Sequence, residues 1–112
     1  MNLLVLILKK VELQDEILRH LAEAGIKGGT VIDGVGMAKA LVDLEDIPIF
    51  GTLRHVFSED QSLISKVMMF VLENEQLNQA RNIIKEIIGD LTAPNTGIMF
   101  NIPIAEVEGY KK

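Results

Sequence analysis

"LLVLIL", residues 3–8, is a continuous apolar run that is followed by two lysines. Six residues are too few for a stable helix but enough for a strand, and a run without polar alternation is typical of a strand covered on both faces. A second run with the same character, "KVMMFVL", occupies residues 66–72. The sequence therefore predicts two buried strands in one sheet.

Each of these strands is followed by apolar residues at helical spacing. The first such stretch predicts a helix over about 12–24 that ends at Gly25, and the second predicts a helix that Asn74 caps and Gly89 ends. The apolar stripe of the second helix consists of Leu77, Ala80, Ile84 and Ile87.

Two further strands complete the pattern. Residues 28–37 and 96–104 read as strands, and "DLTAPN" at 90–95 has the composition of a turn. Gly34 and Gly36 indicate a bulge or a close backbone approach in the earlier of these strands.

The order of elements predicts an α+β fold. Strand, helix and strand are followed by a long connection at about 38–62 and then by strand, helix and strand again. Right-handed crossovers place both helices on one face of a four-stranded antiparallel sheet with the first and third strands in its centre, which is a single ferredoxin-like βαββαβ domain over 1–112. One apolar face of the central strands then lacks a cover, and a patch of that size indicates an oligomer.

Composition excludes several classes of function. The chain has 112 residues, a net charge of −5, one tyrosine, no tryptophan and no cysteine. This charge repels a nucleic-acid backbone, and the scarcity of aromatic rings leaves little surface for base stacking. No run approaches the roughly 20 apolar residues of a membrane span, and residues 3–8 lack the flanks of a signal peptide. We expect a cytoplasmic protein that binds no nucleic acid and does not insert into membranes.

No constellation points to catalysis or to a metal. His20 and His55 have no second ligand at a suitable spacing, and the acidic residues at 43–46 are typical of a solvated loop. The serines have no recognisable base partner. We expect neither an enzyme nor a metal site.

The long connection is unusually apolar. It contains "IPIFGTLRHVF" at 47–57, after a stretch at 37–46 whose apolar spacing is helical and ends at Pro48. The apolar side chains either fold back as additional core or form a partner-binding surface with aromatic anchors and an arginine contact. The partner-binding residues of that second interpretation are Ile49, Phe50, Leu53, Arg54 and Phe57.

Two glycine-containing turns are candidate ligand contacts. Residues 34–36 either cradle a phosphate or bend the strand, and residues 95–97 either offer backbone donors to an anion or form a simple turn after Pro94. Both alternatives stay open at the level of sequence.

Three segments of the sequence are distinctive together: "EAGIKGGTVIDGVGMAKA" (23–40), "KVMMFVLENEQLNQARNIIKEIIGD" (66–90) and "TGIMFNIP" (96–103). Through them the chain resembles, over nearly its whole length, the PII signalling proteins and their PII-like relatives. This resemblance implies a homotrimer whose sheets face inward, with ATP or ADP bound in clefts between subunits. It also implies a T-loop, here 37–62, that grips a membrane transporter, a metabolic enzyme or a transcription factor. Carried over by position, the cleft residues are Thr30, Gly34, Val35, Gly36, Asn95, Thr96 and Gly97.

Two departures from the family pattern bear on the ligand. Ile98 stands where the family places a phosphate-binding lysine, and the tail has Glu106, Glu108 and Tyr110 where arginines are usual. A triphosphate without charged partners is poorly held, so an adenine-containing or smaller ligand stays open. Two alternatives to a PII-like regulator are a structural or metal-tolerance trimer similar to the CutA-type proteins and a small ferredoxin-like enzyme.

Overall fold

A computed structural model describes residues 1–42 and 64–111 of the chain. Its elements are β1 (Asn2–Leu8), a short 3-10 helix η1 (Val11–Leu13), α1 (Gln14–Glu23), β2 (Gly29–Val35), α2 (Met37–Val42), β3 (Ile64–Leu72), α4 (Asn74–Ile88) and β4 (Gly97–Pro103). The predicted α+β class is confirmed.

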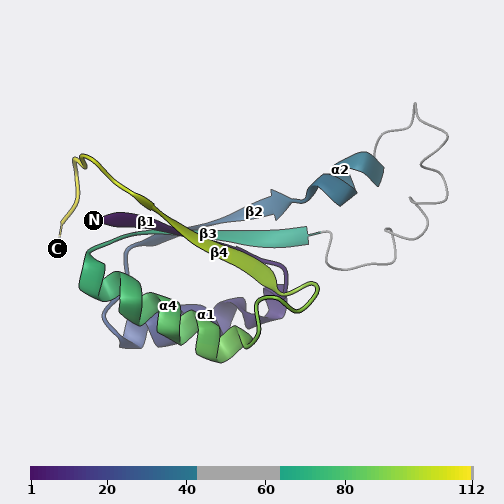
Figure 1. The fold of residues 1–112 in the computed structure, drawn as a ribbon, viewed down its shortest axis with the longest axis horizontal. Coiled ribbons are helices and arrows are strands. Elements are labelled where there is room, and N and C mark those ends of the chain that lie inside the picture. The colour runs from purple at the N-terminus through teal and green to yellow at the C-terminus, as the bar shows by residue number, and fades with distance from the viewer. Residues whose placement is uncertain (43–63, 112) are drawn as a thin grey trace.

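The four strands form one antiparallel sheet in the order β2-β3-β1-β4. The two apolar runs, β1 and β3, are its central strands, as the order of elements predicted. Helices α1 and α4 lie on the same face of this sheet (Figure 1). This arrangement is compatible with a ferredoxin-like fold.

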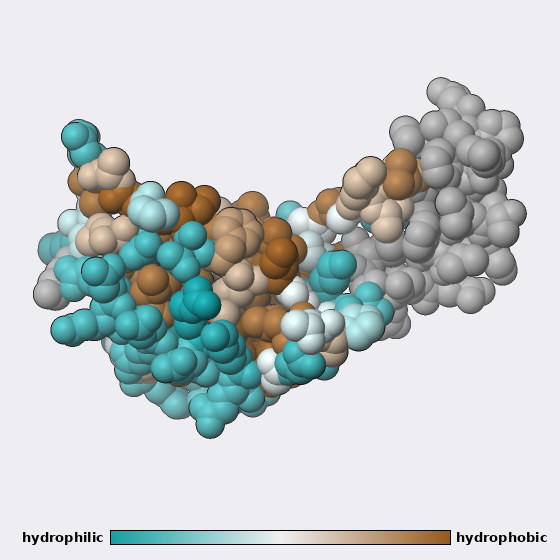
Figure 2. All heavy atoms as spheres, in the orientation of Figure 1, coloured by the Kyte–Doolittle hydropathy of each residue, from teal (hydrophilic) through white to brown (hydrophobic). Residues whose placement is uncertain are grey.

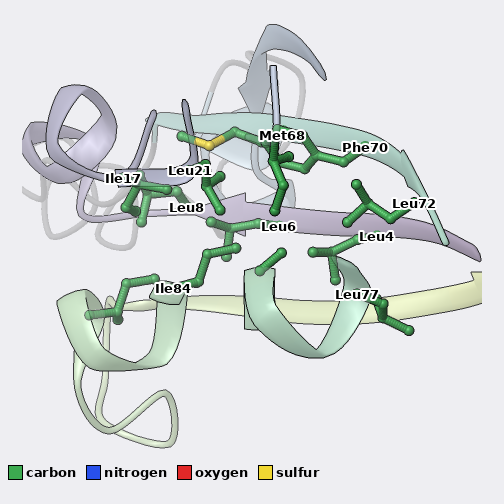
Figure 3. Packing of buried hydrophobic residues seen from close by; sticks show 13 residues of the cluster. Leu4, Leu6, Leu8, Ile17, Leu21, Met68, Phe70, Leu72, Leu77 and Ile84 are labelled. Carbon is green, nitrogen blue, oxygen red and sulfur yellow. The ribbon is translucent and has the colours of Figure 1, made fainter. Parts of the chain in front are cut away.

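The core lies between the sheet and these two helices. Alternate residues of β1, namely Leu4, Leu6 and Leu8, are fully buried there. They pack with Ile17 of α1 and Ile84 of α4 in one cluster (Figure 3). The sequence left open which alternate set of β1 faces the helices, and the structure assigns this set.

The other sheet face carries apolar side chains that no element covers within the described residues. The register places Val5 between Met69 of β3 and Phe100 of β4, and Ile7 between Val67 and Ile98. Ile98 is 56% exposed. Figure 2 shows hydrophobic residues along the strands and mostly hydrophilic ones over the helices. We call this surface the open face; its apolar residues are Leu3, Val5, Ile7, Ile32, Val67, Met69, Val71, Ile98, Phe100 and Ile102.

Both long helices end next to the glycines that the sequence predicted as stops. Gly25 and Gly89 have φ angles of 88° and 86°, a conformation that glycine adopts without a steric penalty. The predicted cap at Asn74 is wrong: Asn74 is the first residue of α4, its Oδ1 accepts a hydrogen bond from Asn2 Nδ2 at 3.0 Å, and Glu73 is the N-cap residue. The buried stripe of α4 ends at Ile88 rather than at Ile87.

The strand that was expected over 28–37 is shorter in the structure. β2 ends at Val35 and α2 begins at Met37, which confirms that the start of the long connection is helical. The ladder between β2 and β3 runs without a bulge from Gly29 opposite Phe70 to Val35 opposite Ile64. Gly34 instead marks a close approach, because a Cβ atom there would lie 2.6 Å from Ser65 Oγ.

The burial of Leu6 in the core leads to a prediction about stability. Leu6 is completely buried, so Leu6→Ala should lower the free energy of unfolding by about 2–5 kcal/mol through lost burial and the cavity that remains. Val35→Ala is the matched control, because Val35 is 68% exposed and should change stability by less than about 0.5 kcal/mol. Urea denaturation followed by circular dichroism measures both. Equal losses for the two variants would contradict the described packing.

Candidate functional site

The two predicted ligand segments lie on opposite edges of the sheet. Residues 30–36 belong to β2 and its end, residues 95–97 lead into β4, and both central strands lie between them. With neighbouring strands about 4.8 Å apart, three spacings separate the edges by roughly 14 Å. Both segments nevertheless lie at the same end of the sheet, since Gly34 pairs with Ser65 while Leu8 pairs with both Lys66 and Gly97.

Thr96 holds the 95–97 turn in place. Its Oγ1 lies 3.0 Å from the carbonyl oxygen of Leu91 and 2.9 Å from that of Ala93, and its own carbonyl oxygen accepts hydrogen bonds from the backbone N–H groups of Lys9 and Lys10. Its side chain is 2% exposed. The hydroxyl and the carbonyl oxygen of Thr96 are therefore engaged within the chain, and a ligand would depend mainly on its neighbours.

The neighbours of Thr96 have special backbone conformations. Asn95 has a φ angle of 62°, which asparagine tolerates better than most residues. Gly97 has a φ angle of 154°, and a Cβ atom there would lie 2.7 Å from the carbonyl oxygen of Ile7. The identity of these two residues follows from the geometry of the turn.

An ionised carboxylate lies in the turn that leads to these residues. Asp90 Oδ1 accepts hydrogen bonds from Thr92 Oγ1 at 2.6 Å and from the backbone N–H of Thr92 at 2.9 Å. The side-chain bond from Thr92, followed by its backbone bond, lowers the pKa of Asp90 below its ordinary value. Negative charge is thus stabilised in this turn.

The β2 segment leaves more of its groups accessible. Thr30 is exposed and pairs with Met69, which puts its hydroxyl at the margin of the open face. Gly36 has its carbonyl engaged by the N–H of Ala40 at 3.1 Å, so it starts α2. On the helix side of the same strand, Asp33 forms an ion pair with Lys66. Toward the open face, β2 offers a ligand the Thr30 hydroxyl, the exposed side chain of Ile32 and backbone groups.

Ile98, at the position of the expected lysine, is exposed on the open face. No group of three or more His, Cys, Asp or Glu side chains that could hold a metal lies within residues 1–42 and 64–111. In the same part of the chain, no helix is long and apolar enough to cross a membrane. The predicted partner-binding residues Ile49, Phe50, Leu53, Arg54 and Phe57 lie outside the described residues.

Sequence reasoning missed a groove of about 510 Å³ at the opposite end of the sheet. We call it the tail groove, because the tail supplies part of its wall. Its residues come from four separate segments of the sequence, so no local motif predicts this groove. They are Gly25, Ile26, Lys27, Gly28, Val71, Leu72, Gln76, Gly109, Tyr110 and Lys111.

Comparison with known proteins gives no family assignment. No protein-family model matches the chain, and a search of curated proteins finds no match.

The geometry at Gly97 leads to a prediction about the turn. Gly97→Ala should lower the free energy of unfolding by about 1–3 kcal/mol, because the new methyl group meets the backbone of β1 and the φ angle disfavours a side chain. Gly28→Ala is the matched control, since a Cβ there has no atom within 4 Å and its φ angle is ordinary. Thermal and urea unfolding compare the two. If Gly97→Ala left the free energy of unfolding unchanged, the turn would have room for a side chain, and backbone geometry would not explain the glycine.

Proposed function

We propose that this protein is a PII-like regulator of the cytoplasm: a non-enzymatic homotrimer that binds a small metabolite or nucleotide between subunits. Residues 37–62 would carry the signal to a protein partner such as a membrane transporter or a metabolic enzyme. One observation carries the proposal. An apolar open face is bordered by the two candidate ligand segments at the same end of opposite sheet edges.

Association is supported by the chemistry of the open face. Ile98 and Phe100 of β4 and Ile32 of β2 are exposed, and the β1 and β3 residues between them are also apolar. Water in contact with a continuous apolar surface of this kind favours its burial against another protein surface. In a ring of identical copies related by rotational symmetry, each copy can cover the open face of its neighbours.

The position of the two ligand segments supports a site between subunits. Within one chain, Gly34 and Gly97 lie on opposite edges of the sheet, with β1 and β3 between them. A ligand that contacted both would have to extend across the open face. In a ring of copies whose open faces point inward, the β2 edge of one copy would meet the β4 edge of the next. The ligand would then bind where these edges meet.

The expected ligand has little phosphate charge. The turn at its β4 side contains Ile98 in place of a lysine, engaged polar groups at Thr96 and the ionised Asp90 nearby in sequence. Lysine or arginine partners dominate the binding of phosphate groups in proteins. Backbone groups, Thr30 and apolar contacts instead suit an adenine-containing or smaller ligand.

The alternative is a structural trimer, similar to the CutA-type proteins, that senses no nucleotide. The observation in its favour is that Thr96 and Gly97 have structural roles that account for them without a ligand. Equilibrium binding to a panel of nucleotides and metabolites separates the two functions, since a structural trimer should bind none of them.

The open face leads to a prediction about assembly. Met69→Asp should reduce the mass in light scattering from that of a trimer to that of a monomer, because it buries a charge in the interface. Asn78→Asp adds the same charge to the exposed surface of α4 and should leave the trimer intact. Leu6→Asp should unfold the chain, since Leu6 faces the core. A monomeric wild-type protein at micromolar concentration would overturn the proposed assembly.

The position of Ile98 leads to a prediction about nucleotides. Calorimetry should find weak or absent binding of ATP with magnesium. Ile98→Lys should tighten it about tenfold by supplying one charge-assisted contact, provided that the cleft has the family geometry. Ile98→Gln is the matched control, because it is polar without the charge. Low-micromolar binding by the wild type would show that other groups hold the phosphates.

A further inference from the structure

The tail groove lies at the end of the sheet opposite to the base of the 37–62 connection. Residues 25–28 join α1 to β2, residues 71 and 72 end β3, and Gln76 belongs to the first turn of α4. Gly109, with a φ angle of 79°, lets the tail turn so that residues 109–111 complete the wall. In Figure 1 the C-terminus lies near the start of β1, at the end of the molecule away from α2.

The charges of the tail groove are opposite in sign to those of the whole chain. The chain carries a net charge of −5, yet the ten residues that line the groove include Lys27 and Lys111 and no acidic side chain. Both lysines are exposed, and neither has an ion pair or hydrogen bond with another described residue. Two ammonium groups that pair with no carboxylate of the described residues therefore lie beside the tail groove.

The floor of the groove is apolar. Ile26 and Leu72 are 4% and 2% exposed, and Val71 is half-buried beside them. The half-buried ring of Tyr110 adds an aromatic surface from the tail. An apolar floor below cationic groups matches a small molecule that has an anionic end and a compact apolar body.

We propose that the tail groove binds a small organic phosphate. Lys27 and Lys111 would hold the phosphate, whose charge of about −2 near neutral pH matches the two ammonium groups, and lysine is a common phosphate ligand in proteins. The apolar body would lie against Val71 and the ring of Tyr110. Binding would join the tail to the α1–β2 linker, because the two lysines come from these two segments.

This site does not need the proposed trimer, because one chain supplies every residue of the groove. The ligand segments at 30–36 and 95–97 have no part in it, and Val71 is the one groove residue that also belongs to the open face. The site can therefore exist in a monomeric variant such as Met69→Asp, and its failure would leave the intersubunit site untouched.

Nuclear magnetic resonance with phenyl phosphate as the probe tests the proposal. In the 15N-labelled protein, millimolar phenyl phosphate should shift the amide signals of Gly25, Gly28 and Gly109 along saturable curves. Inorganic phosphate should bind more weakly because it has no apolar body, and phenol should bind more weakly because it has no charge. Equal effects of all three probes would overturn the proposal.

Charge variants complete the test. The double variant Lys27→Gln and Lys111→Gln should weaken phenyl phosphate at least tenfold. Lys85→Gln, on the exposed surface near the other end of α4, should leave the affinity unchanged. Unperturbed signals elsewhere would establish that each variant is folded. Shifts of amide signals outside the groove, or shifts that persist in the double variant, would also overturn the proposal. If the double variant fails to fold, Lys111→Gln alone replaces it, and this single variant should still bind phenyl phosphate more weakly than the wild type.

Discussion

The rest of the structure depends on the burial of one apolar face of β1 and β3 beneath α1 and α4. Side chains of a strand alternate between its faces, so a run such as "LLVLIL" supplies apolar groups to both. Helices α1 and α4 cover Leu4, Leu6 and Leu8, which gives the chain its own core. The same sequence that makes this core necessarily makes the open face, since Val5 and Ile7 belong to the same strand. The proposed association of several copies would cover that face.

Much of the fold could be predicted because its signals are local. Apolar runs of strand length, helical spacing and the glycines at 25 and 89 each act over a few residues, and each predicted element exists. The assignment of Asn74 failed because a tertiary bond to Asn2 competes with capping. That bond extends a chain in which Asn101 Nδ2 donates to Asn2 Oδ1 and Arg81 Nη1 donates to Asn101 Oδ1, tying α4 to β1 and β4. These four residues belong to three separate elements, so they give no local sequence pattern.

The candidate site could be predicted only in part. The composition of residues 34–36 and 95–97 indicates two turns that a ligand could contact, and the structure gives definite structural roles to Gly34, Thr96 and Gly97. Some glycines are needed because a neighbouring backbone lies close, and others because a ligand does. A single sequence cannot distinguish these two cases, since both appear simply as glycine. The tail groove was missed for a different reason: its lysines at 27 and 111 are neighbours only after the tail turns at Gly109.

The edge strand β2 connects the two ends of the molecule. Its first residues adjoin the tail groove, and its last residues adjoin Gly36, α2 and the 37–62 connection. β2 has one neighbour in the sheet, β3, and most of its side chains are exposed, so fewer contacts hold it than hold the central strands. β2 is thus held by fewer contacts than the central strands, and it joins the loop at 25–28, which lines the tail groove, to the base of the 37–62 connection. A ligand at either end would act on this strand, and a change in its position would reach α2 without disturbing the core beneath β1.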